Sequence, residues 1–276
     1  MPSPLSLDRH RPTEPWPGVV VVGGGKGGVG TSTVAGLLAL ASARLGARTL
    51  LVEAVHGVSV LPLLFGREAP AEGLLTRGGP DVRALRREVA PGLTLLPGGG
   101  TPDELSSSRQ GERAARVRRA ASLYDEHEMT VVDAGCRLDE VLGAVSVGAE
   151  RMVVVASSSR IALAGAHALF KSVLLRGSSV RLELLLNGCD EAVARDAFDL
   201  TREAGRRFLG QGPAHAGTLP RAPELEEGRP AREGLQAVPP EAPVLASASR
   251  VVRRWHDEQR RAREEGAPVI PLAGTG

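Results

Sequence analysis

A glycine-rich segment, GGGKGGVGTST, occupies residues 23–33 of this 276-residue chain. It follows the apolar run VVVV (19–22) and opens an apolar segment, 32–46, with the pattern of a helix. A turn between a strand and a helix gathers backbone N–H groups at the positive end of the helix dipole, and glycines let the backbone approach an anion closely. Ser32, at the start of the helix, carries a hydroxyl that can ligate Mg²⁺ between phosphates. The segment predicts a phosphate-binding loop, and the alternative is a turn whose glycines serve tight packing.

Two side chains of this loop stand out. The chain has only two lysines, Lys26 and Lys171, among many arginines, so a lysine at a particular place is informative. Lys26 lies in the middle of the glycine-rich segment and supplies a positive charge to a bound phosphate. Thr31 occupies the position where such a loop usually carries a lysine, which raises the question of whether the site is complete.

Two further polar residues end apolar strands. Asp133 ends MTVVDAG (129–135), where a carboxylate beside the phosphate loop would hold the Mg²⁺ shell through water; the alternative is a cap for the next helix. Asn187 ends a strand in LLLNGCD (184–190), and an amide can pair with a base edge through its donor and its acceptor. Asp190, three residues later, fits equally well as the N-cap of the following helix.

Short apolar runs alternate with helical patterns from residue 18 onward. Strands are expected at 18–23, 48–54, 93–99, 129–135, 151–157, 181–187 and 214–220, and helices at 32–46, 109–127, 159–177, 190–209 and 242–265. Continuous Val and Leu runs separated by helices predict an α/β fold with a doubly wound, mostly parallel sheet covered on both faces. Ligands of such sheets bind at the carboxyl ends of the strands, where the polar residues above would meet.

The composition points to a single globular domain. Residues 1–17 are rich in proline and predict a disordered arm, 18–265 a single globular domain, and 266–276 a flexible tail. The formal net charge of +2 is too small to argue for nucleic acid. Cys136 and Cys189 lack ligand-like spacing, which favours a reducing compartment over a zinc site or a disulfide. No signal peptide or membrane span is recognised, so we expect a cytoplasmic protein.

GKGGVGTST (25–33) resembles the deviant Walker A motif, K-G-G-x-G-K-[ST], of the MinD/ParA family of P-loop ATPases. The resemblance, which spans roughly residues 18 to 255, implies ATP and Mg²⁺ as cofactors. It assigns Lys26 to the lysine that reaches the partner's phosphates in an ATP-sandwiched homodimer. It makes Lys26 and Asp133 the catalytic residues, and Ser32 and Asp133 the metal ligands. The loop residues that it assigns to nucleotide binding are Gly25, Lys26, Gly27, Gly28, Val29, Gly30, Thr31, Ser32 and Thr33.

The segment TLLVEAVHGVSVLPLLFG (49–66) resembles the family's switch I, with two departures. Glu53 takes the place of the first aspartate, and Val55 that of the second, which in relatives helps to position the attacking water. Valine cannot accept a hydrogen bond, so hydrolysis by the usual route is in doubt. His56 is a substitute to consider, although a lone loop histidine is more often exposed. Gly135 would belong to switch II, where a backbone N–H senses the γ-phosphate.

Other stretches extend the resemblance to the MinD/ParA family and indicate a type within it. In MinD/ParA relatives the asparagine equivalent to Asn187 touches adenine, and TLPRAPE (218–224) is similar to the loop that closes over the base, with Pro220 and Arg221 as candidates. GLTLLPGGGTPDEL (92–105) and VPPEAPVLASASRVVRRW (238–255) are similar to segments of the flagellar-number regulators of the FlhG/FleN type.

Two predicted helices, 242–265 and 109–127, are candidates for membrane binding and DNA binding, respectively. The last helix mixes arginines with acids and has few apolar residues beyond Val251, Val252 and Trp255, so we expect a docked, solvated helix rather than one inserted in a membrane. Peripheral association at the inner face of the cell membrane is not favoured. ParA-type relatives use arginine-rich helices for nonspecific DNA binding, but Glu112 and DEHE dilute this basic patch, and a solvated face is favoured. The arginines concerned are Arg109, Arg113, Arg116, Arg118 and Arg119.

Two functions follow from the resemblance. The first is an ATP-dependent dimeric switch that regulates flagellar number, flagellar placement or cell polarity through a protein partner, with slow hydrolysis. The second is a non-catalytic ATP-binding scaffold of the CpaE/TadZ pilus-assembly type, which the departures at Thr31, Glu53 and Val55 favour. A metabolic enzyme related to nitrogenase reductase is disfavoured because the cysteine pairs that hold its metal cluster are missing from the sequence.

Overall fold

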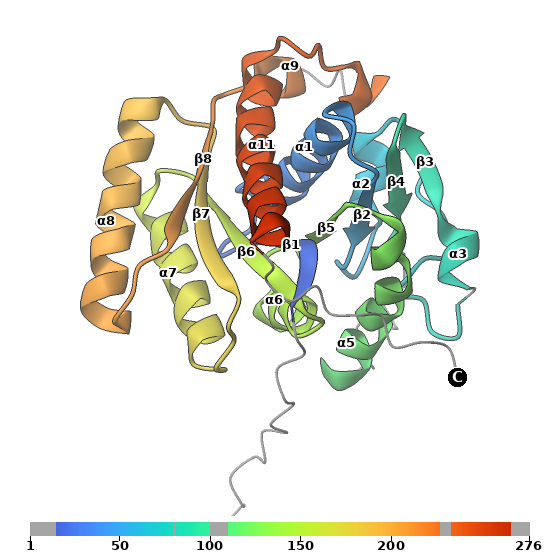
Figure 1. Ribbon diagram of the computed structural model, residues 1–276, viewed down its shortest axis with the longest axis horizontal. Coiled ribbons are helices and arrows are strands. Elements are labelled where there is room, and N and C mark those ends of the chain that lie inside the picture. The colour runs from blue at the N-terminus through green and yellow to red at the C-terminus, as the bar shows by residue number, and fades with distance from the viewer. Residues whose placement is uncertain (1–14, 80, 100–109, 227–232, 266–276) are drawn as a thin grey trace, which may run out of the picture.

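A computed structural model describes residues 15–79, 81–99, 110–226 and 233–265 of the chain. One eight-stranded sheet with the order β3-β4-β2-β5-β1-β6-β7-β8 forms its centre (Figure 1). All neighbouring strands run parallel except β3 and β4. The strands are β1 (Trp16–Gly24), β2 (Thr49–Glu53), β3 (Arg87–Ala90), β4 (Leu93–Leu96), β5 (Met129–Asp133), β6 (Ala149–Ala156), β7 (Arg181–Asn187) and β8 (Ala214–Leu219).

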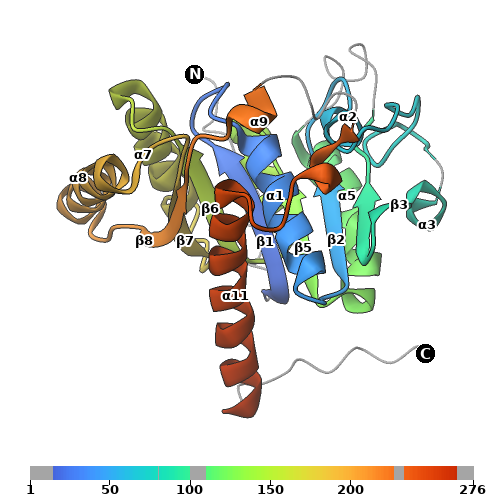
Figure 2. The same ribbon diagram turned by 90° about the horizontal axis from the view of Figure 1, so that it is seen from above.

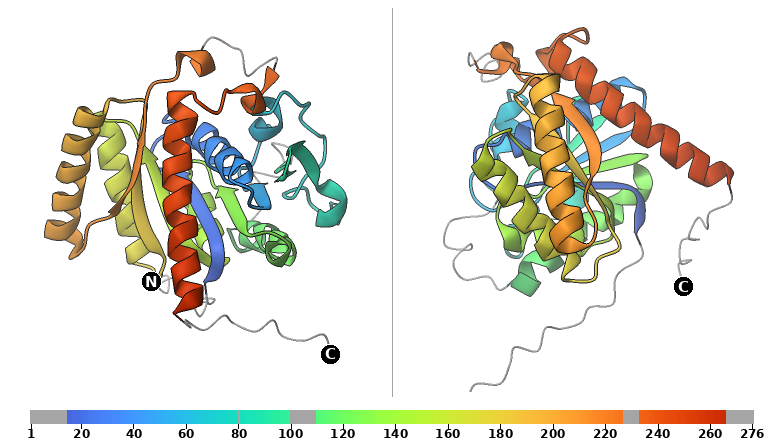
Figure 3. Two further views of the ribbon diagram at one scale, coloured as in Figure 1. Left: turned by 45° about the horizontal axis from the view of Figure 1, so that its top comes forward. Right: turned by 90° about the vertical axis from the view of Figure 1, so that its left-hand side faces the viewer.

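Helices cover both faces of the sheet, as Figures 2 and 3 show. Helices α1 and α11 pack against each other on one face, and α5, α6, α7 and α8 lie on the other. The α-helices are α1 (Thr31–Arg44), α2 (Val60–Leu64), α3 (Val82–Leu85), α5 (Gln110–Arg118), α6 (Leu138–Val145), α7 (Arg160–Leu174), α8 (Glu191–Leu209), α9 (Pro223–Glu226) and α11 (Pro243–Glu264). Two 3₁₀ segments, Arg119–Glu126 and Leu235–Ala237, complete the described elements. The predicted doubly wound α/β fold is confirmed.

The core follows from the apolar runs of the sequence. Val20, Val21 and Val22 of the central strand β1 are fully buried, because helices cover the sheet on both sides. Leu and Ala of α1 face them, and the buried aromatic side chains of the described residues are Phe65, Tyr124, Phe170, Phe198 and Trp255. Burial of such runs on both faces is the main favourable contribution to folding.

Several boundaries differ from expectation. Strand β1 begins at Trp16, whose N–H donates to the Gly148 carbonyl at 2.7 Å, so the ordered sheet starts inside the predicted arm. The helix expected at 109–127 changes to 3₁₀ geometry at Arg119. Helix α6 and the antiparallel edge strand β3 were not anticipated, because both are short, at eight and four residues. The remainder of the predicted arm (1–14) and the predicted tail (266–276) lie outside the described residues.

The last helix is docked on the sheet. Val251, Val252 and Trp255 of α11 are buried, which confirms the expectation that these side chains fix the helix. Buried Arg151 of β6 donates to Glu183 of β7 at 2.6 Å, and Trp255 Nε1 donates to the other Glu183 oxygen at 3.1 Å. Arg254 also donates to the carbonyl of Ala216 at 2.9 Å, which protects the edge strand β8 from pairing with another chain.

None of the helices in the part of the chain that the structure describes has the length and hydropathy that a membrane span requires.

Candidate nucleotide-binding site

The phosphate loop joins β1 to α1 at the carboxyl edge of the sheet. Gly30 takes the N-cap position of α1 in the left-handed conformation (φ 85°, ψ 26°), which only glycine adopts readily. No side chain caps α1, so the N–H groups of its first turn remain available to an anion. Gly28, at φ 80°, gives the loop a second left-handed turn. The loop therefore has the backbone geometry of an anion cradle.

Neighbouring segments fix this loop from two sides. The Gly24 N–H donates to the Gly135 carbonyl at 2.7 Å, which joins the loop to the segment after β5. Gly25 lies directly against the backbone of Gly165 in α7, where a side chain on either residue would overlap main-chain atoms. Sequence reasoning missed Gly165, because a glycine inside a helix gives no hint of its contact.

Lys26 and Thr31 lie differently around the cradle. Lys26 is exposed, and its Nζ has only a long contact of 3.5 Å to the Gly27 carbonyl, so the ammonium group can reach a ligand or a second molecule. Thr31 is 8% exposed and its hydroxyl faces the backbone of Gly24. No cation replaces the missing lysine at position 31 itself. Ser32 and Thr33, which follow, are half-buried in the first turn of α1.

Asp133 lies beside the loop and is fully buried. One carboxylate oxygen accepts the Gly135 N–H at 3.0 Å, and Oδ2 has no hydrogen-bond partner among the described residues. The Ser32 side chain, in the first turn of α1, lies close enough to the carboxylate to favour its charged form. Burial raises the pKa of Asp133 to about 6, against the opposing hydrogen bonds, and Glu53 and Glu140 add to the increase. The structure thus brings together Ser32 and Asp133, the two predicted metal ligands, and leaves one buried oxygen unpaired.

Glu53 is a structural anchor. Its Oε1 accepts the N–H groups of Val60 (2.6 Å) and Leu61 (2.9 Å), so its carboxylate caps the short helix α2. Its Oε2 accepts the Gly98 N–H at 2.9 Å and the Ser59 hydroxyl. Sequence reasoning placed Glu53 at the first switch I aspartate, and its carboxylate is already engaged in these contacts.

Val55 and His56 follow β2. Val55 packs against Gly135, so the segments after β2 and β5 meet through a methyl group at the position where the switch I resemblance led us to expect an aspartate. The expectation that His56 is exposed was wrong: its side chain is 2% exposed, and Nδ1 lies 3.4 Å from Glu140 Oε1 of α6. Glu140 was not recognised in the sequence. The available signal was an acid in the apolar pattern LDEVLGAV, 138–145.

Asn187 contacts the loop from β7. Its Nδ2 donates to the Val29 carbonyl at 2.9 Å, so its amide is engaged with the loop backbone.

Asp190 occupies the N-cap position of α8 as expected, but its side chain makes no capping hydrogen bond. Pro220 is half-buried and Arg221 exposed in the segment after β8, and the Gly188 N–H donates to the Leu219 carbonyl at 2.9 Å, which links the two strand ends.

The arginines of the predicted basic patch are partly engaged with the chain itself. Arg116 donates to the Leu75 carbonyl at 2.8 Å, and Arg119 to the carbonyls of Leu74 and Gly79 at 3.4 Å each. Arg109 and the side chain of Arg113 lie outside the described residues. These contacts weaken the case for a DNA-binding face on α5.

The fold and the glycine-rich loop define a P-loop protein of the MinD/ParA class. A family model described as cellulose biosynthesis protein BcsQ matches residues 18–210, and the chain belongs to this family. It is 27% identical over 210 residues to the antiactivator FleN of Pseudomonas aeruginosa, covering 73% of each chain. The predicted resemblance to the MinD/ParA family and its FlhG/FleN-type members is confirmed.

Solved structures agree on the fold. The MinD protein of Pyrococcus horikoshii, complexed with Mg-ADP, superimposes with a TM-score of 0.68 at 18% identity, covering 86% of this chain and 94% of that one. MinD in the MinC:MinD complex of Aquifex aeolicus gives a TM-score of 0.68 at 20% identity, covering 94% and 99%. Identities this low establish the shared architecture alone.

Proposed function

We propose that this chain is an ATP-binding switch protein whose ATP-bound form dimerises and regulates flagellar number, flagellar placement or cell polarity through a protein partner. The observation that carries the proposal is the loop itself. Its first-turn N–H groups are uncapped, Lys26 is exposed beside them, and Asp133 keeps an unpaired oxygen next to Ser32. The likeness to the antiactivator FleN, taken with the resemblance of 92–105 and 238–255 to the flagellar-number regulators, supports the flagellar part of the proposal.

Mg²⁺ fits the donor set at this site. The cation prefers hard oxygen ligands and keeps several waters, and Ser32 and Asp133 offer a hydroxyl and a carboxylate at the start of α1. Ser32 would contact the ion, and Asp133 would hold its water shell. The bound cation would neutralise phosphate charge and would also compensate the buried carboxylate. The P. horikoshii relative is a Mg-ADP complex, which supports the same assignment.

The remaining assignments of nucleotide-contacting residues belong to the same proposal. The backbone N–H groups of Gly25 to Thr33 would surround the phosphates, and Lys26 would contact them within the dimer as a catalytic residue. Pro220 and Arg221 would lie over the base. Asn187 would brace the loop through its contact with Val29, and its amide oxygen would remain available for the adenine contact expected from sequence.

Slow hydrolysis is the second part of the proposal. Val55 presents methyl groups to Gly135, and Thr31 is turned toward Gly24, so neither supplies a water-positioning group or a cation. Both observations also favour the alternative, a non-catalytic ATP-binding scaffold of the CpaE/TadZ type. Phosphate release under saturating Mg-ATP separates the two functions, because measurable turnover would contradict the scaffold.

Lys26→Ala tests the proposal most directly, with Lys171→Ala as the matched control on the exposed end of α7. We expect the loss of Lys26 to weaken Mg-ATP binding by about 10- to 100-fold, since a hydrogen bond to a charged group contributes about 1.5–3 kcal/mol. We also expect it to abolish ATP-dependent dimerisation, measured by sedimentation velocity. Lys171→Ala should change neither. A monomer that ignores Mg-ATP in the unmodified protein would contradict the proposed switch.

A further inference from the structure

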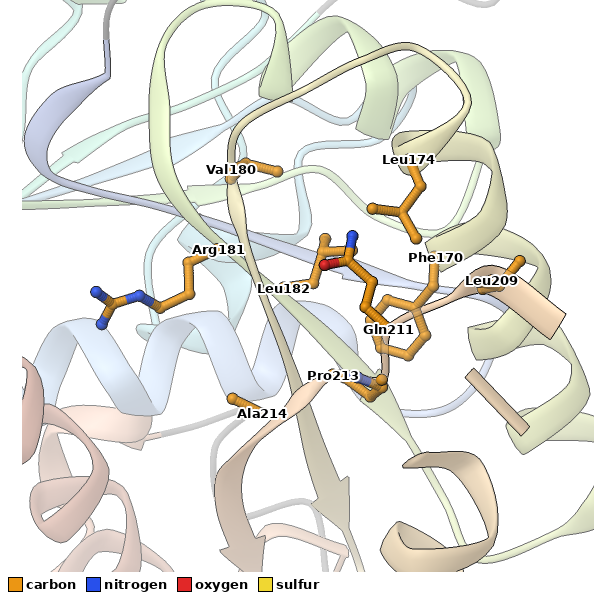
Figure 4. A pocket seen from close by; sticks show the side chains of 10 residues that line it. Phe170, Leu174, Val180, Arg181, Leu182, Leu209, Gln211, Pro213 and Ala214 are labelled. Atoms are coloured by element: carbon orange, nitrogen blue, oxygen red, sulfur yellow. The ribbon is translucent and has the colours of Figure 1, made fainter. Parts of the chain in front are cut away.

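A cavity of about 250 Å³ lies at the end of the sheet opposite the phosphate loop (Figure 4). The end of α7 supplies Phe170 and Leu174, the start of β7 supplies Leu182, the end of α8 supplies Leu209, and the segment between α8 and β8 supplies Pro213. Strands β7 and β8 begin here, whereas the loop after β1 lies where the parallel strands end. The cavity is therefore separate from the candidate nucleotide site.

Close backbone packing fixes one wall of this cavity. A Cβ on Gly205 of α8 would lie 2.9 Å from the Gln211 carbonyl oxygen, and one on Gly212 would lie 2.6 Å from the Arg202 carbonyl oxygen. Two glycines thus let the segment before β8 pack directly on the last turns of α8. This close backbone packing holds the wall in place, which lowers the entropic cost of binding.

The rim of the cavity is basic. Segments 170–182 and 204–214 contain arginines and a lysine and no acid. Arg181 is neutralised by Glu258 at 2.6 Å and points away from the cavity lining in Figure 4. Four other cations remain exposed, and within the described part of the chain no ion pair neutralises them. They are Lys171, Arg176, Arg206 and Arg207.

Two large apolar side chains accompany these cations. Leu175 is 76% exposed and Phe208 69% exposed, and each follows or precedes a residue that lines the cavity, Leu174 or Leu209. Phe208 is held between neighbours, since Arg207 lies 5.4 Å from its ring centre and His167 6.4 Å. Exposed apolar side chains with a basic rim around a concave site are features of a protein-binding surface.

We propose that this surface binds an acidic segment of a partner protein, which inserts one aliphatic or aromatic side chain into the cavity. The carboxylates of the segment would pair with Lys171, Arg176, Arg206 and Arg207. A symmetric contact with a second copy of the chain is excluded, because the two positively charged rims would repel each other. A preformed cavity also suits one inserted side chain better than it suits a bilayer, which contacts protruding side chains. This proposal does not depend on nucleotide binding.

The test is a selection of random 16-residue peptides on the full-length protein without nucleotide. The expected consensus has acidic residues flanking a single Leu, Ile, Met or Phe. A synthetic peptide of that consensus, labelled with fluorescein, is then titrated by anisotropy. We expect Arg206→Glu combined with Arg207→Glu to weaken its binding at least about tenfold, and Ala214→Phe, which fills the cavity from an exposed position, to weaken it comparably.

The matched control is Arg261→Glu combined with Arg263→Glu. It changes the same charge at the last turn of another helix, α11, and should leave peptide binding unchanged. Thermal melting of every variant establishes that it is folded. A consensus without acids, the recovery of no binding peptide, or an affinity unaffected by the α8 variant would overturn the proposal. Adsorption to phosphatidylglycerol–phosphatidylcholine vesicles that requires Arg206 and Arg207, in place of peptide binding, would overturn it too.

Discussion

Asn187 at the end of β7 donates a hydrogen bond of 2.9 Å to the carbonyl of Val29 within the phosphate loop. The contact joins two segments that are 158 residues apart in sequence and leaves Nδ2 engaged with the loop backbone. We expect Asn187→Ala to weaken ATP and GTP binding equally, by about fivefold, because a neutral hydrogen bond contributes about 1 kcal/mol. Titration with fluorescent ATP and GTP analogues measures both affinities.

The ratio of the two affinities decides between the roles of Asn187. A side chain that braces the loop affects both nucleotides alike, whereas a side chain that reads the base affects adenine selectively. A loss confined to ATP would therefore support the adenine-contact interpretation. Asp190→Ala serves as the control, since the Asp190 side chain makes no cap hydrogen bond and should leave both affinities unchanged.

Val55→Asp combined with Thr31→Lys should create or accelerate ATP hydrolysis. The double variant supplies a carboxylate beside Gly135 and a cation in the loop. These are the two groups that the family resemblance leads us to expect and that Val55 and Thr31 replace. Phosphate release is measured against the unmodified protein, and Val55→Asn with Thr31→Lys controls for the polar side chain without the charge. Equal turnover by all three proteins would show that these positions do not limit the reaction.

Asp133→Asn should stabilise the nucleotide-free protein at high pH. The pKa of Asp133 is about 6 in the folded chain against 3.8 as its ordinary value, so the native state retains a proton that the unfolded state loses. The free energy of unfolding therefore falls as the pH rises through this interval and is lower by about 3 kcal/mol at pH 8. At pH 4.5 the same linkage lowers it by about 1 kcal/mol.

Urea denaturation of the Asp133→Asn variant at the two pH values measures this difference. Asparagine cannot ionise, so the substitution should raise the free energy of unfolding more at pH 8 than at pH 4.5. Any amide N–H that finds no hydrogen-bond partner in the buried site reduces this gain at both pH values. The exposed substitution Asp190→Asn should change the free energy of unfolding by less than about 0.5 kcal/mol at either pH. An equal effect of Asp133→Asn at both values would contradict the raised pKa.

Glu183→Leu should destabilise the fold by about 3–5 kcal/mol, because it leaves the buried Arg151 guanidinium without its closest carboxylate. Adding Arg151→Met should recover much of this loss, since an apolar pair leaves no buried charge. Urea denaturation followed by circular dichroism measures both variants. Asp257→Ala, which breaks an exposed pair with Arg260, should cost less than about 0.5 kcal/mol. A double variant as unstable as the single one would show that Trp255 and Arg254 depend on Glu183 more than Arg151 does.

The sequence predicted the sheet and the loop because their signals are local. Runs such as VVVV identify buried strands by themselves, and the glycine spacing of 25–33 identifies the cradle without any knowledge of the rest of the fold. Asp133 was found for the same reason, as a carboxylate at the end of an apolar strand.

The contacts around the loop could not be predicted because they depend on the packing of distant segments. Glu53 resembled a switch residue in sequence, but its distance to Val60, Leu61 and Gly98 makes it a cap for α2 and an anchor for the segment after β4. His56 was expected to be exposed, yet α6, which was not anticipated, buries it against Glu140. Each error arose where a third segment determines what a side chain contacts.

The backbone contact between Gly25 and Gly165 has a mechanical consequence. With no side chain between them to absorb a displacement, any movement of the loop must be shared by α7, a 15-residue helix. The far end of that helix carries Leu174 at the basic-rimmed cavity. Helix α7 thus connects the phosphate loop to the basic-rimmed cavity, so that a ligand bound at the loop can alter the shape of the cavity, and the reverse.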